Sequence, residues 1–464
     1  MKLLRGYPEL IIFTILACAT RLWGLFNPPA VVFDEVYFKA YAGDYFYGIY
    51  YFDIHPPLGK LLLAGWAWLA HINPAALAGS DPAVVLRILP AVAGALIIPM
   101  FYAFMRTLGG SRQVAALGAA LLLLDNALLV ESRFILIDSM LILFGLTALT
   151  CFLAARSRSG RTRLILLALS AFTAGLAVST KWTGLAAIGL IGLVWTSDQV
   201  RQHRHISWPR LLVESAILVL VPIAVYVSVF AVHFSLLPNS GPGDAFMPAQ
   251  YQATLVGNPN YDPSAHLSFL QKFGALNGVM LLSEQSLKTA THPYSSKWTS
   301  WPLMVRTVYY WQGPTQADGR QGNIYLLGNP ILWWGILIVI LAGSIASTGA
   351  LRRLKPYRFA LTFLLLGYLI NFLPFSRIDR VMFLYHYFFA LICSLAFAMI
   401  FLGALCDWNN AKHPWHFPSA TSRGIYLGIL GVAVVSFAYF APLSYGTPLS
   451  PAEIEHHMWL KSWR

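Results

Sequence analysis

Long apolar segments recur along this 464-residue chain and leave few folds open to it. A helix of about 20 apolar residues crosses a bilayer, because its backbone polar groups are then hydrogen-bonded within the helix. Charged residues form only 11% of the chain, whereas soluble domains contain about 25%. The sequence therefore predicts an all-α, polytopic membrane protein with about eleven transmembrane helices.

The predicted spans are residues 9–26, 84–105, 113–125, 134–155, 164–179, 183–197, 211–233, 329–348, 359–375, 381–405 and 424–442. Residues 58–71 are also apolar, but this segment is too short to span easily, so we expect an interfacial or re-entrant helix there. Residues 234–328 are the only polar stretch of any size and are rich in Pro, Gly, Asn and Ser. We expect a loop with short helices from this stretch.

Basic residues gather in short loops between the apolar segments, and this pattern accounts for the net charge of +13 without a nucleic-acid partner. They lie at Lys2, Arg5, 156–163, 201–210 and 352–358. With the predicted spans all of them fall on one side, which the positive-inside rule makes cytoplasmic. Loops 27–83 and 234–328 are then extracytoplasmic.

Two adjacent carboxylates, Asp34 and Glu35, follow the end of the first predicted span. Carboxylates at the mouth of a bilayer are costly unless they are used. One interpretation makes Asp34 a general base that removes a hydroxyl proton while a sugar carbon is attacked. The alternative is a helix N-cap or a solvated interfacial pair. Further along the same loop, Asp53, His55 and Lys60 flank a rigid Pro-Pro pair and favour the functional interpretation.

Arg133 stands at the predicted extracytoplasmic start of a span, and Asp138 lies little more than one helical turn beyond it. A guanidinium is always charged and binds phosphate or carboxylate bidentately, so Arg133 is a candidate for holding an anionic group. The alternative is that it pairs with Glu131 or Asp138 and holds helices together. Lys181 lies between two apolar segments on the same side, where it would either contact a lipid phosphate or anchor a helix end.

Arg21 lies within the first predicted span, close to its outer end, and either snorkels to the interface or pairs with one of the two adjacent carboxylates. Arg377 and Arg380 precede the aromatic block that opens the tenth span, and a pair of arginines suits an anionic head group. His386 lies in this aromatic block, where a lone histidine is more often a hydrogen-bonded packing residue than a catalyst.

The four cysteines show no Cys-x-x-Cys spacing, and the histidines show no spacing typical of a metal site. We therefore expect no cofactor. A carboxylate pair can still hold Mg²⁺ or Mn²⁺ when substrate oxygens complete the coordination, so a divalent metal at the Asp34–Glu35 pair stays an alternative.

Five blocks carry a resemblance to a known family. In chain order they are Phe33-Asp34-Glu35, Asp53-Ile54-His55-Pro56-Pro57-Leu58-Gly59-Lys60, Glu131 to Met140, Lys181-Trp182-Thr183-Gly184 and Phe383-Leu384-Tyr385-His386-Tyr387. The chain resembles the protein O-mannosyltransferase family, which has the membrane glycosyltransferase C-type (GT-C) fold. The resemblance implies that residues 1–464 form a single membrane glycosyltransferase domain, with the catalytic motif in the first extracytoplasmic loop, 27–83, and a large extracytoplasmic loop at 234–328.

Members of this family transfer mannose from a polyprenyl monophosphate to Ser or Thr of secreted proteins and invert the anomeric carbon. The resemblance gives Asp34 the role of the base and Glu35 a supporting role, and Arg21 and Arg133 match functionally important arginines. The other candidates serve the donor phosphate or lipid (Lys181, Arg377, Arg380) or support the site (Asp53, His55, Lys60, Asp138, His386).

Eukaryotic members carry a β-trefoil module in the large loop, and segment 234–328 is too short for it. The chain thus resembles the bacterial branch, which implies a polyprenol shorter than dolichol. We expect a multi-pass protein of the cell inner (plasma) membrane with an extracytoplasmic active site. Two alternatives stay open: a transferase of the same fold that modifies a lipid or cell-wall glycan, and a transporter of polyprenyl-linked sugars. Transporters usually show inverted repeats, which this sequence does not.

Overall fold

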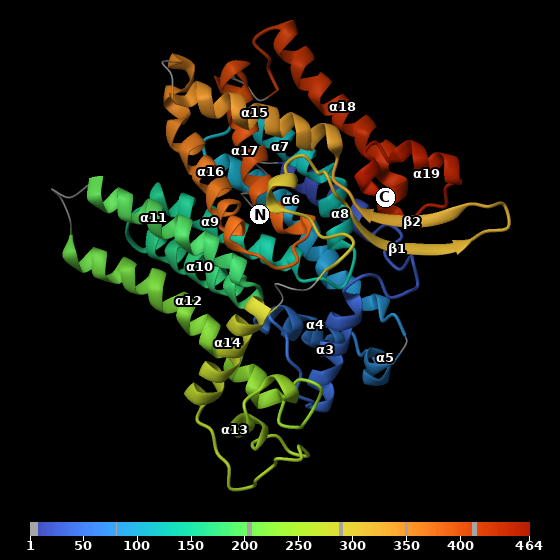
Figure 1. The fold of residues 1–464 in the computed structure, drawn as a ribbon. Coiled ribbons are helices and arrows are strands. Elements are labelled where there is room, and N and C mark those ends of the chain that lie inside the picture. Colours follow the sequence, from blue (N-terminus) through green and yellow to red (C-terminus); the bar gives the residue numbers. More distant parts are fainter. Residues whose placement is uncertain (1–7, 80, 202–206, 287–290, 349–350, 411–414) are drawn as a thin grey trace.

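The computed structural model describes residues 8–79, 81–201, 207–286, 291–348, 351–410 and 415–464. Within these ranges the protein is a bundle of helices that carries further short helices and a β-hairpin (Figure 1). The helices of the bundle are α2 (Pro8–Leu22), α6 (Ile88–Thr107), α7 (Arg112–Leu123), α8 (Asn126–Ser132), α9 (Asp138–Arg156), α10 (Gly160–Thr180), α11 (Leu185–Arg201), α12 (Trp208–Leu236), α15 (Pro330–Thr348), α16 (Arg358–Ile370), α17 (Phe388–Leu405) and α18 (Ala420–Tyr445). Each of the eleven predicted spans overlaps one of these helices.

Fewer helices than predicted are long and apolar enough to cross a membrane. Seven helical segments of the described ranges meet this condition, or eight if α7 and α8, which are bent by 63°, form one span. The count of eleven is therefore not confirmed. α2 has 15 residues and α11 has 17, which is short for a complete crossing. The bend falls at Asp125, whose carboxylate caps α8 by accepting a hydrogen bond from the Leu128 amide.

The bundle has central and peripheral helices. In the apolar windows of α9 and of the segment Leu384–Leu405, 72% and 83% of the residues are buried, against 17% in α12 and 22% in α18. α9 packs against α6 and α10, and α17 packs against α15 and α16. α12 and α18 lie on opposite flanks of the bundle (Figure 1). Their exposed side chains, such as Leu220 and Val435, are those expected of lipid-facing helices.

The elements outside the bundle come from the α2–α6 connection, the α12–α15 connection and the segment after α18. They are α3 (Glu35–Tyr47), α4 (Leu58–Leu69), α5 (Pro74–Ala78), α13 (Ala249–Gln252), α14 (Phe269–Ser286), α19 (Pro451–His457), β1 (Val308–Thr315) and β2 (Gln321–Leu326). The short helix expected at 58–71 is present as α4. The first loop and the long central segment meet directly, because the amide of Tyr50 donates to the carbonyl of Asn239 at 2.8 Å.

The stretch 234–328 contains more regular structure than predicted. α14 has 18 residues, and β1 and β2 pair antiparallel, with Val308 opposite Leu326 (Figure 1). The hairpin explains why an all-α prediction is incomplete. Its strands are rich in tyrosine and tryptophan, and Asp318-Gly319 lies between them, which together are typical of a hairpin.

The acidic residue Asp138 lies at one end of the bundle, and a group of arginines lies at the other end. α9 begins at Asp138 and ends at Arg156, so these two residues lie about 27 Å apart along the helix. Arg163 of α10, Arg210 of α12 and Phe359 of α16 line one cavity together with Arg156. Described residues at or beside the three basic loops thus lie at one end of the bundle, as their predicted common side requires.

This arrangement predicts opposite accessibility for two exposed serines, Ser157 and Ser264. We expect a membrane-impermeant maleimide to label Ser264→Cys in intact cells and Ser157→Cys only after permeabilisation. Both variants are made in a chain whose four native cysteines are replaced by alanine. Labelling of both positions from the same side would contradict the predicted topology.

Candidate active site

Asp34 follows a residue with an uncommon backbone conformation. Phe33 has a φ of 49°, in the left-handed region that bulky residues rarely adopt. Asp34 then occupies the N-cap position of α3, but its side chain makes no capping hydrogen bond. In the described part of the chain no group donates a hydrogen bond to this carboxylate. The geometry therefore does not support the N-cap interpretation and leaves the carboxylate available.

The surroundings of Asp34 make it a stronger base than an ordinary aspartate. The pKa of Asp34 is raised from 3.8 to about 6, chiefly by burial; the charges of Asp138 and Asp53 act in the same direction, and the charge of Lys181 opposes the shift. A carboxyl group with a pKa near 6 is ionised at neutral pH. It can also accept a proton more readily than a solvent-exposed carboxylate.

Lys181 and Asp138 form a buried ion pair beside Asp34. Lys181 Nζ donates to the two carboxylate oxygens of Asp138 at 2.9 and 2.8 Å and lies 5.1 Å from the centre of the Tyr385 ring. This pair joins the end of α10 to the start of α9, so Lys181 anchors a helix end. Its charge also acts on Asp34, which keeps a phosphate-binding role open to it.

Glu35 is fully buried and has a partner that the sequence analysis missed. Its two oxygens accept from Nε and Nη2 of Arg87 at 2.7 and 2.8 Å. The same oxygens accept from the amides of Val32 and Ile135. Each carboxylate oxygen of Glu35 thus accepts two hydrogen bonds. This fits the supporting role of Glu35 and argues against a metal shared between Glu35 and Asp34.

Arg87 also holds the loop that leads to Asp34. It lies at the end of the 3₁₀ helix η1 (Val84–Arg87), and its guanidinium donates to the carbonyls of Pro28 and Ala30 at 2.8 and 2.7 Å. Sequence reasoning placed Arg87 inside an apolar span and gave it no role. A charged residue inside such a span is itself a signal of a buried partner.

A tyrosine of the hairpin reaches the same site. The hydroxyl of Tyr310 donates to Glu131 at 2.6 Å, so Glu131 does not pair with Arg133. The Tyr310 ring stacks on Phe33 with ring centres 4.5 Å apart, and Phe383 meets Phe33 edge-on. Tyr310 escaped the sequence analysis because no hairpin was expected there.

The structure brings together three candidate residues of the first loop, Asp53, His55 and Lys60. Lys60 Nζ donates to Asp53 at 2.6 Å and to the carbonyls of His55 and Pro56. Burial, together with nearby positive charges, holds the pKa of His55 well below its usual range, so this imidazole is neutral. With His233 of α12, these three residues line a small cavity.

Arg133 holds the end of α2. Its guanidinium donates to the carbonyls of Arg21, Trp23 and Gly24 at 3.0, 2.6 and 3.0 Å, and it lies over the Tyr445 ring. Neither of the two carboxylates considered as partners accepts a hydrogen bond from it. These contacts suit a positioning residue and give no support to the assignment of Arg133 to the donor phosphate.

Arg21 is buried, which contradicts the snorkelling interpretation. Its guanidinium donates to the hydroxyl of Thr20 at 2.8 Å and to the carbonyl of Leu123 at 3.3 Å. The pairing with Asp34 or Glu35 is wrong as well, because Arg87 takes the place beside Glu35. Arg21 therefore joins α2 to the end of α7.

The two arginines near the tenth predicted span do not act as a pair. Arg377 is exposed, whereas Arg380 is partly buried and its positive charge acts on His55. His386 Nδ1 lies 3.0 Å from the carbonyl oxygen of Phe383, and its ring stacks on Trp301. This is the packing environment expected for His386. Arg380 stays a candidate for contact with an anionic group.

Two family models match the chain. The model described as dolichyl-phosphate-mannose-protein mannosyltransferase matches residues 11–238. The model described as the C-terminal four TMM region of protein-O-mannosyltransferase matches residues 269–463. Together they include every residue of the site described above.

Known proteins are similar in sequence and in fold. Protein O-mannosyltransferase 1 of Drosophila pseudoobscura pseudoobscura is 36% identical over 52% of this chain and 28% of its own length. Dolichyl-phosphate-mannose–protein mannosyltransferase 3 of Saccharomyces cerevisiae is 33% identical over 67% and 45%. The matches thus span less than half of these relatives. A solved S. cerevisiae protein O-mannosyltransferase complex bound to the sugar donor is 19% identical, with a TM-score of 0.88 over 98% of this chain and 92% of that one, which shows the same fold.

The buried ion pair predicts a large stability loss in Arg87→Ala. The variant leaves Glu35 charged and without its partner, and we expect the free energy of unfolding to fall by about 3–5 kcal/mol. Arg353→Ala is the matched control, since Arg353 is 62% exposed and pairs with Asp407 at the surface. We expect a loss of about 1 kcal/mol or less from the control. Unfolding of both variants in detergent, by heat or denaturant, measures the difference, and equal losses would refute the structural role of Arg87.

Proposed function

This chain belongs to the protein O-mannosyltransferase family, and on this premise we propose that it is a polyprenyl-phosphate-mannose–protein mannosyltransferase. The reaction moves mannose from a polyprenyl monophosphate to a Ser or Thr hydroxyl of a secreted protein. The observation that carries the proposal is the Asp34 carboxylate, which is half-buried, receives no hydrogen bond in the described structure and has a pKa raised to about 6. The acidic side chains around it are held by partners of their own.

Asp34 acts as the general base in this proposal. As the acceptor hydroxyl oxygen attacks the anomeric carbon, its proton passes to the Asp34 carboxylate. The bond between that carbon and the phosphate oxygen breaks on the opposite side of the sugar ring, and the polyprenyl phosphate leaves with the bonding electrons. One base and one displacement give inversion, and no covalent bond between sugar and enzyme is formed.

The leaving phosphate needs positive charge, and two cations of the site can supply it. Lys181 and Arg380 both act electrostatically on groups of the Asp34 cluster. Fixed charges that are in place before the reaction stabilise a developing anion without reorganisation. We assign the donor phosphate to these two residues, and we assign Arg133 to positioning of the α2 end because of its carbonyl contacts.

The proposal places Asp34 on the extracytoplasmic side of the inner (plasma) membrane. The meeting of the basic loops at the other end of the bundle supports this orientation. A bacterial polyprenol as donor lipid rests on the sequence resemblance alone. We propose that no cofactor is needed, because Lys181 and Arg380 supply the charge that a metal would otherwise bring.

Transfer itself is tested with purified protein, labelled polyprenyl-phosphate-mannose and a Ser/Thr-rich peptide. Label in the peptide supports the proposal. Label that appears only in a lipid or glycan product supports the alternative transferase, and movement of intact labelled donor across a vesicle membrane supports a transporter.

Asp34→Asn is expected to keep the fold and to lower transfer by about 10²–10⁴-fold, the usual cost of losing a general base. Asp44→Asn is the control. Burial also raises the pKa of Asp44 to about 6, but this residue lies ten positions further along α3, about 15 Å away. Turnover of both variants is measured in the peptide assay. Near-normal transfer by Asp34→Asn would reject this base and direct attention to Asp53.

The raised pKa of Asp34 also predicts a pH dependence. The base must be deprotonated, so kcat/KM for the peptide should be flat above the folded-state pKa of about 6 and fall tenfold per pH unit below it. A pH profile of the wild type measures this limb. Asp44→Asn should retain it, and a profile that stays flat down to pH 4 would show that no group with this pKa acts as the base.

A further inference from the structure

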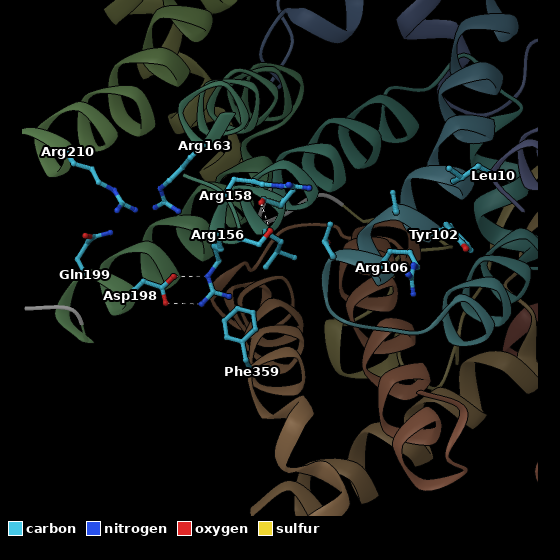
Figure 2. A pocket seen from close by; sticks show the side chains of 15 residues that line it. Leu10, Tyr102, Arg106, Arg156, Arg158, Arg163, Asp198, Gln199, Arg210 and Phe359 are labelled. Atoms are coloured by element: carbon cyan, nitrogen blue, oxygen red, sulfur yellow. Dashed lines mark hydrogen bonds and ion pairs between the residues drawn. The ribbon is translucent and has the colours of Figure 1, made fainter. Parts of the chain in front are cut away.

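A cavity of about 800 Å³ opens at the end of the bundle away from Asp34. Figure 2 shows the side chains that line this cavity. Arginines from the ends of four helices line it. They are Arg106 of α6, Arg156 and Arg158 at the end of α9, Arg163 of α10 and Arg210 of α12. The proposed transfer reaction uses none of these residues.

The arginines of this cavity outnumber their carboxylate partners. Arg156 pairs bidentately with Asp198 at 2.7 and 2.9 Å. Glu214 pairs with both Arg163 and Arg210. Among Arg156, Arg158, Arg163 and Arg210, four guanidinium groups thus face two carboxylates, a balance of +2. Like charges that line one cavity repel each other, and a bound anion relieves this repulsion.

Several of these guanidinium groups are held in place. Arg156 lies 3.8 Å from the centre of the Phe359 ring, and Figure 2 shows it between that ring and Asp198. Arg163 donates to the carbonyl of Ala155 as well as to Glu214. Positive groups that are already positioned bind an anion with a smaller loss of entropy.

Arg158 and Arg210 are the most available members of the cluster. Arg158 is exposed, and no side-chain hydrogen bond of its guanidinium appears in the described structure. Arg210 is 51% exposed while its partner Glu214 is buried. Both side chains can therefore turn a guanidinium edge toward a ligand, and this edge fits phosphate oxygens bidentately.

The position of the cavity favours a membrane lipid as the source of the phosphate. The length of α9 between Asp138 and Arg156, about 27 Å, is close to the thickness of the hydrocarbon core. The cavity therefore lies at the interface opposite the Asp34 site. Its lining also includes the apolar side chains of Leu10, Leu153 and Phe359, which can meet the start of an acyl chain.

We propose that this cavity binds the phosphate head group of an anionic membrane lipid in the leaflet opposite the Asp34 site. The basic residues at this end of the bundle would then both set the orientation of the protein in the membrane and bind a lipid. The proposal does not depend on the transfer reaction, because the cavity and Asp34 occupy opposite ends of the bundle.

The test is a native mass spectrometry titration of the purified full chain in neutral detergent, with phosphatidylglycerol, phosphatidylcholine or inorganic pyrophosphate as the probe. Wild type should retain phosphatidylglycerol in preference to phosphatidylcholine. The double variant Arg158→Gln/Arg210→Gln should lose about tenfold in affinity for phosphatidylglycerol, as expected for the loss of charge-assisted contacts. Arg161→Gln, an exposed arginine of the same basic loop that does not line the cavity, should bind like wild type.

Thermal unfolding without lipid identifies a double variant that has lost its fold, and Arg158→Gln alone then replaces it, with a smaller loss expected. Equal phosphatidylglycerol binding by all variants would overturn the proposal. So would equal binding of the two lipids by wild type. Binding of pyrophosphate that is sensitive to Arg158 and Arg210, without retention of phosphatidylglycerol, would assign the cavity to a soluble phosphate and overturn the lipid source.

Discussion

The buried ion pair between Glu35 and Arg87 is the interaction on which the candidate site depends. Both side chains are fully removed from solvent, and two charges in that position are tolerated only when each is completely hydrogen-bonded. Their partners are the amides of Val32 and Ile135 and carbonyls of the first loop. The pair therefore ties this loop to the starts of α6 and α9. It also fixes the backbone around Asp34, which lies between Val32 and Glu35 in the sequence.

The carboxylates of the site divide into occupied ones and an available one. Asp138 accepts from a lysine, Asp53 from another lysine, and Glu131 from a tyrosine hydroxyl. These contacts hold four helices (α4, α8, α9 and the end of α10) and the hairpin around Asp34 without using its oxygens. The structure thus combines a rigid backbone position with a carboxylate that is still able to take a proton, which is the combination that a base in a partly dry site requires.

The sequence predicts the positions of the helices and the candidate acidic residues better than it predicts which groups the arginines contact. Apolar segments of bilayer length locate the helices because their signal is local. The role of an arginine, by contrast, depends on residues far away in the sequence. Arg133 could bind a phosphate, yet in the structure it donates to backbone carbonyls at the end of α2. Arg87 went unrecognised for the same reason, since its partner lies 52 positions away. Tyr310 depended on a hairpin whose turn signal, Asp318-Gly319, lies within a stretch that otherwise reads as a loop.

The stacking of Tyr310 on Phe33 joins two parts of the chain that are synthesised far apart in time. Phe33 and Asp34 leave the ribosome early, whereas the hairpin follows only after α12 and α14 have been made. Phe383, which meets Phe33 edge-on, follows later still. The surroundings of the carboxylate are therefore incomplete for most of translation. A nascent chain with its first helices already inserted would carry the acidic residue but not its complete pocket, and activity would appear only late in biogenesis.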